Sequence, residues 1–534
     1  MTPGPGVDER RAFGPSRAAP TRATPTCATA MGGTRALARA APARVLAGLL
    51  AGMLASCAVG PDFKAPAAPQ QRSYLPAALP AATASSDSPD GAAQRLVAEL
   101  DIPGQWWTLF QSKQLNALIE QALANSPTLA AAQAALRQAN ENVAAERGSL
   151  YPSASASISS ERQRASGAEF GSPHALLYTL NSASVSVSYG IDVFGGTRRQ
   201  IEQLQAQADY QRYLLEASYL TLTSNIVTAA VTEASLRAQI AATLEIAQSQ
   251  QAQVDILQRR IVAGGASRAD LLQQQSTLAT TLASLPPLRS QLAQQRNQLA
   301  VYTGIFPDQY AGFEFNLDAL TLPAQLPVSL PSKLVEQRPD VQEYTALLHA
   351  ATANIGVATA NMLPQISISG SYGGAATRVS DVFSPGSIIW SLVGSATQPI
   401  FKGGTLLHQR RAAVAAAQQA AANYQSTVLN AFQNVANTLV ALQADAEALD
   451  ASATAARDAA DSLSIVQLQF KSGGASYVQV LSAEQSYQTA EIAFLKARAQ
   501  RFADTAALFQ ALGGGWWNRT DTALLTYDCC QGKS

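Results

Sequence analysis

The sequence is poor in charge. Charged residues make up 14% of its 534 positions, and 37 basic side chains cancel 37 acidic ones, whereas an ordinary globular chain is about a quarter charged. A neutral chain lacks the basic surface that nucleic-acid binding requires, so no nucleic-acid partner is expected. Apolar residues are 47% of the chain, and with the zero net charge they exclude disorder of the whole molecule.

Cysteine and histidine are also scarce. Four cysteines in a chain of this length exclude a disulfide scaffold. His174, His349 and His408 lie far apart in sequence, which argues against a histidine-rich metal site. The chain has no P-loop, no HExxH, no CxxC and no credible GxSxG pattern. We therefore expect neither an enzyme nor a bound cofactor or metal.

An export signal occupies the N-terminal region. Residues 1–30 show neither a helix nor a strand period, and the pattern changes at Met31. The apolar run at 45–55 has the length of a signal-peptide core and cannot span a bilayer, which takes about 20 residues. Three arginines precede it: Arg35, Arg39 and Arg44. We interpret 1–56 as a misassigned extension followed by a lipoprotein signal peptide, with translation starting at Met31.

The apolar run ends at a sequence typical of lipidation. Leu54, Ala55 and Ser56 precede Cys57, and this order resembles the lipobox of bacterial lipoproteins. The resemblance implies acylation of the Cys57 thiol by palmitate-type chains; an ordinary buried thiol is the alternative. Several acyl chains hold a protein firmly to a membrane. The resemblance to bacterial lipoproteins also implies that Ala58, which is not aspartate, permits sorting to the outer membrane. Residues 57–104 are then predicted to be an acylated linker.

The remaining chain repeats itself once. Pro127 and Pro339 open helical patterns that end at Pro152 and Pro364, and each pair of equivalent prolines is 212 residues apart. Three further features also recur in the same order and at nearly the same spacing: a glycine pair, a Phe-Gly-Gly motif and a later glycine. This recurrence indicates a duplication. The predicted parts are a first repeat, part of an equatorial subdomain, a second repeat and a tail, at 105–304, 305–335, 336–517 and 518–534.

Two segments of each repeat alternate between serine and apolar residues. In the first repeat Val185, Val187 and Tyr189 fall on one face and the intervening serines on the other. A period of two predicts strands, and a serine face opposite an apolar face is typical of a sheet between water and lipid. The predicted strands are 153–160, 182–194, 365–372 and 388–401.

Each repeat also contains a long stretch without a helix breaker, 197–263 or 405–472. A helix of about 67 residues is about 100 Å long, and the glycine pairs should terminate it. A returning helix over 267–303 carries leucine at every seventh position, which predicts an antiparallel coiled-coil hairpin. The prolines at 286–287 predict a kink. The opening helix and the returning helix of a repeat together are nearly as long as its long helix. The two short helices should therefore lie end to end beside the long one.

Four strands cannot close a barrel, and open strand edges do not survive in hydrocarbon. Eight strands from two chains would enclose only side chains, whereas twelve from three chains leave a lumen. The sequence therefore predicts a mainly α protein with a small β part. Long antiparallel coiled-coil helical hairpins form an α-barrel, and four strands per chain complete a 12-stranded trimeric transmembrane β-barrel.

Several motifs resemble those of one family. They are Cys-Ala-Val-Gly-Pro-Asp-Phe at 57–63, Trp106-Trp107 with the helix that follows, the Leu-Tyr-Pro and Met-Leu-Pro helix ends, Phe-Gly-Gly at 194–196, and both glycine turns. The chain resembles the acylated branch of the TolC family of outer-membrane efflux factors. The resemblance implies a homotrimer, lipid-anchored in and spanning the outer membrane, that extends into the periplasm. It implies passive export of small molecules with a periplasmic adaptor (membrane fusion) protein and an inner-membrane pump.

The family closes its periplasmic end by coiling the hairpins inward. Polar groups near the turns are expected to hold this state weakly, because an exposed ion pair contributes only about 0–1 kcal/mol. Ala475 stands where some relatives carry an acidic residue, so no carboxylate ring is expected there. The alternative is that these charges merely solvate helix faces. The predicted tip and gate residues are Asp255, Arg259, Arg260, Gly264, Gly265, Arg268, Asp270, Lys471, Gly473, Gly474, Ser476 and Tyr477, and Glu484 lies in the same region of the second hairpin.

Two other functions stay open on sequence alone. The outer-membrane duct of a type I protein-secretion system would use the same architecture, although the acyl anchor favours small-molecule efflux. A coiled-coil periplasmic scaffold lipoprotein without a channel belongs to a different class. The serine-alternating strands argue against a scaffold, because a scaffold needs no barrel.

Overall fold

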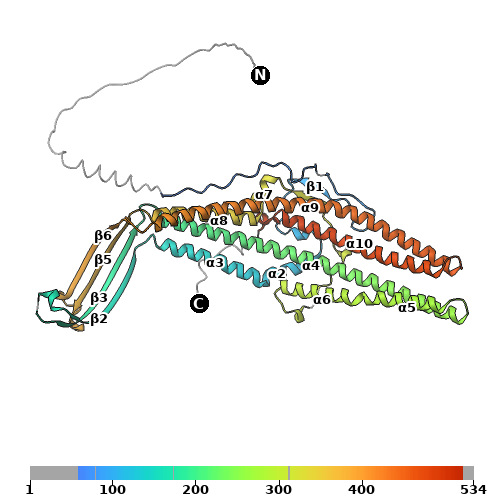
Figure 1. Cartoon of the computed structure of the whole chain (residues 1–534), viewed down its shortest axis with the longest axis horizontal. Helices are drawn as coiled ribbons and strands as arrows, with labels where there is room; N and C mark the ends of the chain where they lie inside the picture. The colour runs from blue at the N-terminus through green and yellow to red at the C-terminus, as the bar shows by residue number, and fades with distance from the viewer. Residues whose placement is uncertain (1–57, 79, 172, 311–312, 521–534) are drawn as a thin grey trace, which may run out of the picture. The chain divides into compact units, whose positions relative to one another are not determined.

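Long helices and a four-stranded sheet make up the protein (Figure 1). The computed structural model describes residues 58–520 apart from 79, 172 and 311–312. The predicted lipidation site Cys57 and the signal-peptide region therefore lie outside the described residues. The helices are α2 (Lys113–Asn125), α3 (Pro127–Gly148), α4 (Gly196–Val262), α5 (Arg268–Ala283), α6 (Leu285–Tyr302), α7 (Pro331–Gln337), α8 (Pro339–Ala360), α9 (Thr405–Lys471) and α10 (Tyr477–Ala511). The strands are β1 (Arg95–Ala98), β2 (Ser153–Ala165), β3 (Leu176–Ile191), β4 (Gln325–Val328), β5 (Gln365–Ala376) and β6 (Ile388–Thr397).

The duplication is visible in the order of the elements. The series α3, β2, β3, α4, α5 and α6 is matched by α8, β5, β6, α9 and α10. Both long helices have 67 residues, as predicted. Pro127 and Pro339 each occupy the first turn of a 22-residue helix, where the missing amide hydrogen costs nothing.

The returning helices differ because only one contains prolines. In the first repeat α5 ends at Ala283 and α6 begins at Leu285, with Pro286 and Pro287 in its first turn. This break confirms the predicted kink, since a proline removes a backbone hydrogen bond and clashes with the preceding turn. The corresponding α10 runs without interruption for 35 residues.

An opening helix and a returning helix lie beside each long one, as the lengths predict. Along α9 pack α8 and α10, and along α4 pack α3 and the returning helix, which is divided into α5 and α6. Helices α8 and α10 also contact α4, so the two repeats share one set of helical contacts. Ala230 and Ala431 are fully buried on the long helices. Such small side chains let neighbouring helices approach closely.

A cluster of aromatic residues forms the middle of the core. Trp106 and Trp107 are each 1% exposed, so both side chains pack in the core. The Trp106 ring stacks on Phe509 of α10 at 5.4 Å between ring centroids, and Phe110 contacts Phe502 at 6.2 Å. Side chains from the segment between the repeats join them, so this segment is held against the middle of the helices: Phe315, Leu317, Leu320 and Leu326.

Part of the predicted linker 57–104 is structured. Strand β1 pairs in parallel with β4. The side chain of Arg501, which is completely buried, donates hydrogen bonds of 2.8 and 2.7 Å to the carbonyl oxygens of Asp90 and Ala92. A buried guanidinium requires such acceptors, so residues 90–98 are fixed by a helix more than 400 positions away. Sequence composition carries no sign of this contact.

The sheet has the order β2-β3-β5-β6, and every neighbouring pair is antiparallel. Strands from the two repeats thus meet at β3 and β5. The predicted strands were partly wrong in extent. Strand β2 continues to Ala165, past the end of the serine alternation, because backbone pairing does not require alternation. Conversely, β3 ends at Ile191 and β6 at Thr397, since the residues that follow turn into the long helices.

Candidate functional site

One face of the sheet is lined by serines. Hydroxyl groups of facing serines hydrogen-bond across two strand pairs, and the bond between Ser159 and Ser182 is 2.8 Å long. The register continues the row across the boundary between the repeats, where Ser186 faces Ser371. Other bonded pairs are Ser157 with Ser184, Ser367 with Ser395, and Ser371 with Ser391. This confirms the polar face that the alternation predicts.

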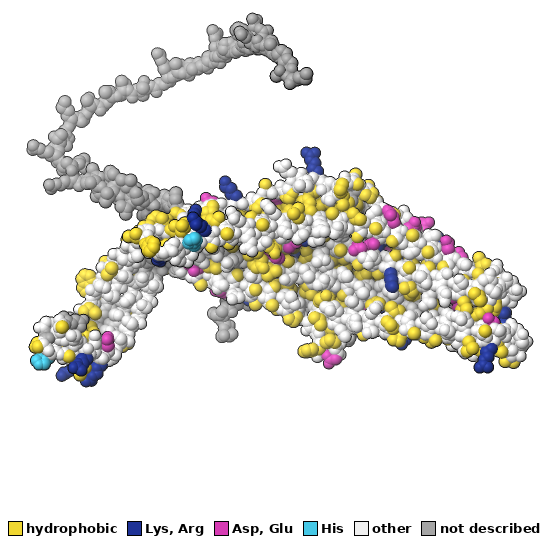
Figure 2. All heavy atoms as spheres, viewed as in Figure 1, with side chains coloured by type: hydrophobic (Ala, Val, Ile, Leu, Met, Phe, Trp, Pro, Cys, Tyr) yellow, Lys and Arg dark blue, Asp and Glu magenta, His cyan; other side chains and the backbone are white. Residues whose placement is uncertain are grey.

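The opposite face is apolar and exposed. The register places Val185 opposite Tyr372, and Tyr372 opposite Trp390. These side chains are 52%, 62% and 74% exposed. Strands β3, β5 and β6 contain no acidic or basic residue, and in the view of Figure 2 charge along the sheet gathers at its loop end. A continuous exposed apolar surface of this kind requires a cover other than water.

The sheet has two open edges within the described chain. Strands β2 and β6 each pair on one side only, and every residue of β6 is exposed. An unpaired edge presents a row of free amide and carbonyl groups, which pair readily with another strand. The sheet is therefore incomplete as a unit of one chain.

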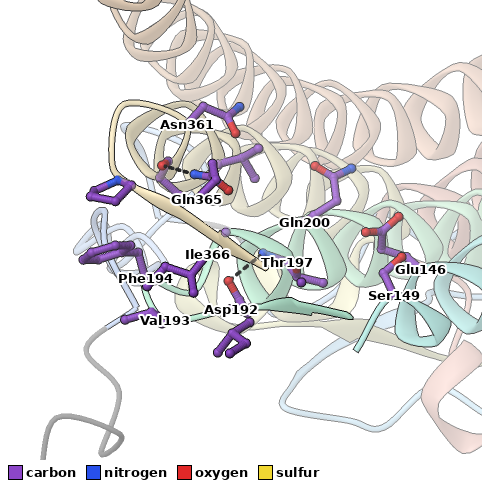
Figure 3. Close-up of a pocket in the computed structure, with 16 residues that line it drawn as sticks. Glu146, Ser149, Asp192, Val193, Phe194, Thr197, Gln200, Asn361, Gln365 and Ile366 are labelled. Carbon is purple, nitrogen blue, oxygen red and sulfur yellow. Dashed lines mark hydrogen bonds between the residues drawn. The ribbon is translucent and has the colours of Figure 1, made fainter. Parts of the chain in front are cut away.

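A polar cavity of about 280 Å³ lies where the sheet meets the helices (Figure 3). Its lining comes from the ends of α3 and β3 and from α4, α8 and β5. Asp192 follows β3 and accepts hydrogen bonds from the backbone amides of Thr197 and Arg198, at 3.2 and 3.0 Å. A carboxylate stabilises the positive N-terminal end of a helix. Asp192 therefore fixes the direction in which α4 leaves the sheet.

The first described residues are bound to the same junction. The amide of Val59 donates to the Phe194 carbonyl at 3.0 Å. Arg199 of α4, whose residue is 5% exposed, donates to the Val59 carbonyl at 3.2 Å and to Asp62 at 2.6 Å. Gly195 has φ +75°, and a Cβ atom there would lie 2.7 Å from Ala58. The chain immediately after Cys57 is thus held at the base of the sheet.

The turn of the first hairpin joins α4 to α5. Gly264 adopts φ +75°, a conformation that favours glycine, and Gly265 donates to the carbonyl of Arg260 at 2.8 Å. Asp270 forms a capping box with Ser267, because each side chain accepts the other's backbone amide, both at 3.1 Å. The predicted gate residue Asp270 therefore already stabilises the start of α5.

The turn of the second hairpin repeats this geometry. Gly473 has φ +81°, and Gly474 donates to the carbonyl of Gln469 at 2.8 Å. Ser476 forms a capping box with Gln479 at the start of α10. Lys471, the last residue of α9, is exposed. Both glycine turns therefore close helices in the way that the sequence predicts.

Other predicted tip charges remain on the surface. Asp255 accepts a hydrogen bond of 2.9 Å from Gln251 on its own helix, and Arg259 and Arg268 are exposed. Within residues 58–520 of one chain, none of these groups nor Lys471 forms an ion pair. They are accessible to neighbouring molecules.

Hydrogen bonds and a cation–π contact, rather than ion pairs, connect the two hairpins inside one chain. The hydroxyl of Tyr477 donates to the side-chain oxygen of Gln274, and the Gln274 amide donates to Glu484 at 3.3 Å. All three residues are buried, and burial raises the pKa of the Glu484 carboxyl. The Arg260 guanidinium lies 4.6 Å from the Phe470 ring centroid, which is a cation–π contact. Arg260 and Tyr477, both predicted to be gate residues, thus make their contacts within one subunit.

Sequence reasoning missed Gln274 and Phe470. Gln274 lies three residues after Leu271, in the leucine heptad, and this spacing places it at a core position. A polar residue at a core position is the signal that could have identified it. No group of three or more His, Cys, Asp or Glu side chains in the described part of the chain is placed to hold a metal ion. None of the described helices is long and apolar enough to cross a membrane.

Comparison with known proteins identifies the class first. The solved outer-membrane channel OprN matches with a TM-score of 0.77 at 25% identity, over 86% of this chain and all of that one. Antibiotic efflux pump outer membrane protein ArpC of Pseudomonas putida is 28% identical over 477 residues, 88% of this chain and 95% of the relative. Cation efflux system protein CusC of Escherichia coli O6:H1 is 26% identical over 486 residues, 89% of this chain and 99% of the relative. The fold and the sheet are therefore those of an outer-membrane channel subunit.

The chain belongs to the outer membrane efflux protein family, whose model matches residues 118–305 and 330–514. The resemblance to TolC-like efflux factors is confirmed. The protein is an outer-membrane channel component of an efflux system. Members of the family are channel proteins rather than enzymes.

Proposed function

We propose that three copies of this chain close their sheets into a 12-stranded β-barrel that spans the outer membrane. The observation that carries this proposal is the sheet with two unpaired edges, an apolar face and a serine face. The strand order alternates in direction, so β6 of one copy would meet β2 of the next in the same antiparallel sense. Eight strands would be filled by side chains, whereas twelve leave a polar lumen lined by the serines.

The hairpins would continue this lumen as an α-barrel through the periplasm. Export through such a conduit is passive for small molecules, and a periplasmic adaptor and an inner-membrane pump would supply the driving force. The names of the relatives, an antibiotic efflux protein and a cation efflux protein, favour efflux over a protein-secretion duct. The exposed apolar face of the sheet counts against a scaffold without a channel.

A lipid on Cys57 would add a second hold on the outer membrane. Val59 and Asp62 are bound at the base of the sheet, which would keep an acylated cysteine near the membrane surface. Apart from this covalent lipid, we propose no cofactor for the channel. Several acyl chains together give firm attachment.

We assign the gate to the exposed charges at the hairpin turns. Asp255, Arg259, Arg268 and Lys471 would form weak links between neighbouring subunits that close the periplasmic end, and contact with the adaptor would release them. Each exposed pair is worth about 0–1 kcal/mol, so binding at the tips can shift the equilibrium to the open state. The two glycine turns, with Asp270 and Ser476, keep the hairpin ends in shape.

Detergent-purified protein tests the proposed channel. We expect a trimer by native mass spectrometry and discrete conductance steps in a planar lipid bilayer. A Cys57→Ser variant should remain in the outer-membrane fraction, because the barrel alone retains it. A water-soluble monomer without conductance would overturn the proposal. A variant released entirely from the membrane would show that the lipid, and not a barrel, is the attachment.

A further inference from the structure

A small cavity lies between the two hairpins, toward their turns. Its volume is about 130 Å³, and its lining comes from α4, α9 and α10. The polar side chains among the lining residues are Glu245, Ser249, Gln250, Glu484 and Tyr487. The cavity thus joins helices of the first repeat to helices of the second.

Two of the lining side chains are deeply buried and incompletely bonded. Gln250 is 1% exposed, and neither its amide nitrogen nor its amide oxygen has a hydrogen-bond partner. Glu484 is 3% exposed; one carboxylate oxygen accepts from Gln274, and the other has no partner. A buried polar group without a partner costs about 1–3 kcal/mol. Two such groups at one cavity indicate a polar occupant.

Negative charge gathers around the same cavity. Glu245 lies at its lining, and Glu245 and Glu491 lie near enough to Tyr487 to add to the effect of burial in raising the pKa of its hydroxyl. Burial and, to a smaller extent, Glu245 raise the pKa of Glu491, and only the Arg498 guanidinium opposes this shift. That guanidinium is already paired with Asp90 and Asp318, each at 2.7 Å. The carboxylates therefore lack a dedicated positive partner.

We propose that this cavity binds a hard divalent cation of the calcium type. Carboxylate oxygens of Glu484 and Glu245, the amide oxygen of Gln250 and the hydroxyl groups of Ser249 and Tyr487 form an oxygen-only donor set. Calcium accepts such mixtures of carboxylate, amide and water oxygens. Two carboxylates leave room for bound water, and the donors lack the nitrogen and sulfur that transition metals prefer.

The cation would tie α4 of the first hairpin to α10 of the second inside one subunit. It would neutralise the negative charge of the carboxylates. The unpartnered side-chain oxygen atoms of Gln250 and Glu484 would coordinate it. This inference goes beyond the proposed channel function, because it concerns a single chain and does not require a trimer or a pore.

Terbium luminescence tests the site, because a tyrosine beside a bound lanthanide transfers its excitation energy to the ion. The full-length protein in detergent is stripped with a chelator and titrated with Tb³⁺. We expect saturable emission on tyrosine excitation, displaced by Ca²⁺. Glu484→Gln should weaken Ca²⁺ competition at least about tenfold, as expected when a site loses a charged ligand. Tyr487→Phe should reduce the emission more than it reduces Ca²⁺ binding measured by calorimetry.

Asp450→Asn is the matched control, since it removes an exposed acid of α9, a helix that contributes to the lining, and Asp450 itself lies outside the cavity. It should leave both titrations unchanged. Gln250→Leu serves as a second variant if Glu484→Gln fails to fold. Absence of saturable emission, or equal Ca²⁺ competition in wild type and Glu484→Gln, would overturn the site and leave water as the occupant. Bilayer conductance of the same samples reports separately on the channel.

Discussion

Arg199, near the start of the first long helix, forms an ion pair of 2.6 Å with Asp62, five residues after the predicted lipidation cysteine. The same guanidinium binds the Val59 carbonyl and Glu202. One buried side chain therefore connects the N-terminal segment to the point where the sheet becomes helix. Arg199 thus makes the side-chain hydrogen bonds that hold this segment, beside the backbone bond from Val59 to Phe194 and the stacking of Phe63 on His349.

Replacing Arg199 with glutamine should release that segment. Hydrogen bonds to a charged group are worth about 1.5–3 kcal/mol, so trypsin cleavage after the exposed Lys64 should become about tenfold faster in native protein. Arg198→Gln is the matched control, because Arg198 bonds to Asp192 and not to the N-terminal segment. Equal cleavage rates in the two variants would show that Arg199 does not hold the segment.

The two faces of the sheet should respond oppositely to charge. Leu392 lies on the apolar face and is 72% exposed, whereas its neighbour Ser391 hydrogen-bonds within the serine face. If lipid covers the apolar face, Leu392→Arg should destabilise the protein by about 2–4 kcal/mol near the bilayer midplane. Ser391→Arg should be tolerated and should change ion selectivity in bilayer recordings. Equal yields and melting temperatures for the two variants would contradict the assignment of the faces.

The helical part of this fold could be predicted from sequence because its signals are local. The first long helix spans Gly196–Val262, one residue from the predicted 197–263, since nothing breaks it before the glycine pair. The strand ends could not be predicted in the same way. Asp192 lies in a segment predicted to be strand, yet its carboxylate accepts hydrogen bonds from the first backbone amides of α4. These bonds form only because the chain turns between the strand and the helix.

The candidate site was predictable to different degrees for the same reason. Gly264 and Gly473 could be assigned from sequence because left-handed helix ends select glycine. The hydrogen bond between Gln274 and Glu484 joins residues 210 positions apart, and no local sequence pattern predicts it. Asp270 was predicted as a gate charge, but its carboxylate caps α5. A charged residue at a turn can either cap a helix or form a link to a neighbouring subunit. Only its contacts in the structure distinguish the two roles.

Stability should depend on pH through Glu343 of α8. Burial, with a smaller contribution from Asp340, raises the pKa of Glu343 to about 7 from 4.5. The protonated side chain is favoured in the folded state, so its contribution is fully present below pH 4.5 and is lost as the pH rises through about 7. The total change is about 3 kcal/mol.

Glu343→Gln should remove this dependence, because glutamine stays neutral at every pH. Melting temperatures measured across the interval would show the wild type losing stability relative to the variant as the pH rises. Glu120→Gln, which changes an exposed acid of α2, should behave like the wild type. Parallel melting profiles for wild type and Glu343→Gln would show that Glu343 does not titrate in this range.

The gate assignment predicts that charge removal at the tips opens the channel. Arg259 and Arg268 are exposed, so their replacement by serine leaves the hairpins folded while removing links to neighbouring subunits. With each link worth about 0–1 kcal/mol, loss of two links should favour the open state by up to about 30-fold for each subunit of the trimer, since 1.4 kcal/mol is a factor of ten. Single-channel recording measures this as higher conductance or longer openings.

Asp270→Asn is the informative contrast: it weakens the α5 cap by about 0.5–2 kcal/mol and should lower thermal stability without the same gain in conductance. If the double arginine variant conducts like the wild type while Asp270→Asn conducts more, the lock lies in the hairpin turn itself and not in the exposed arginines.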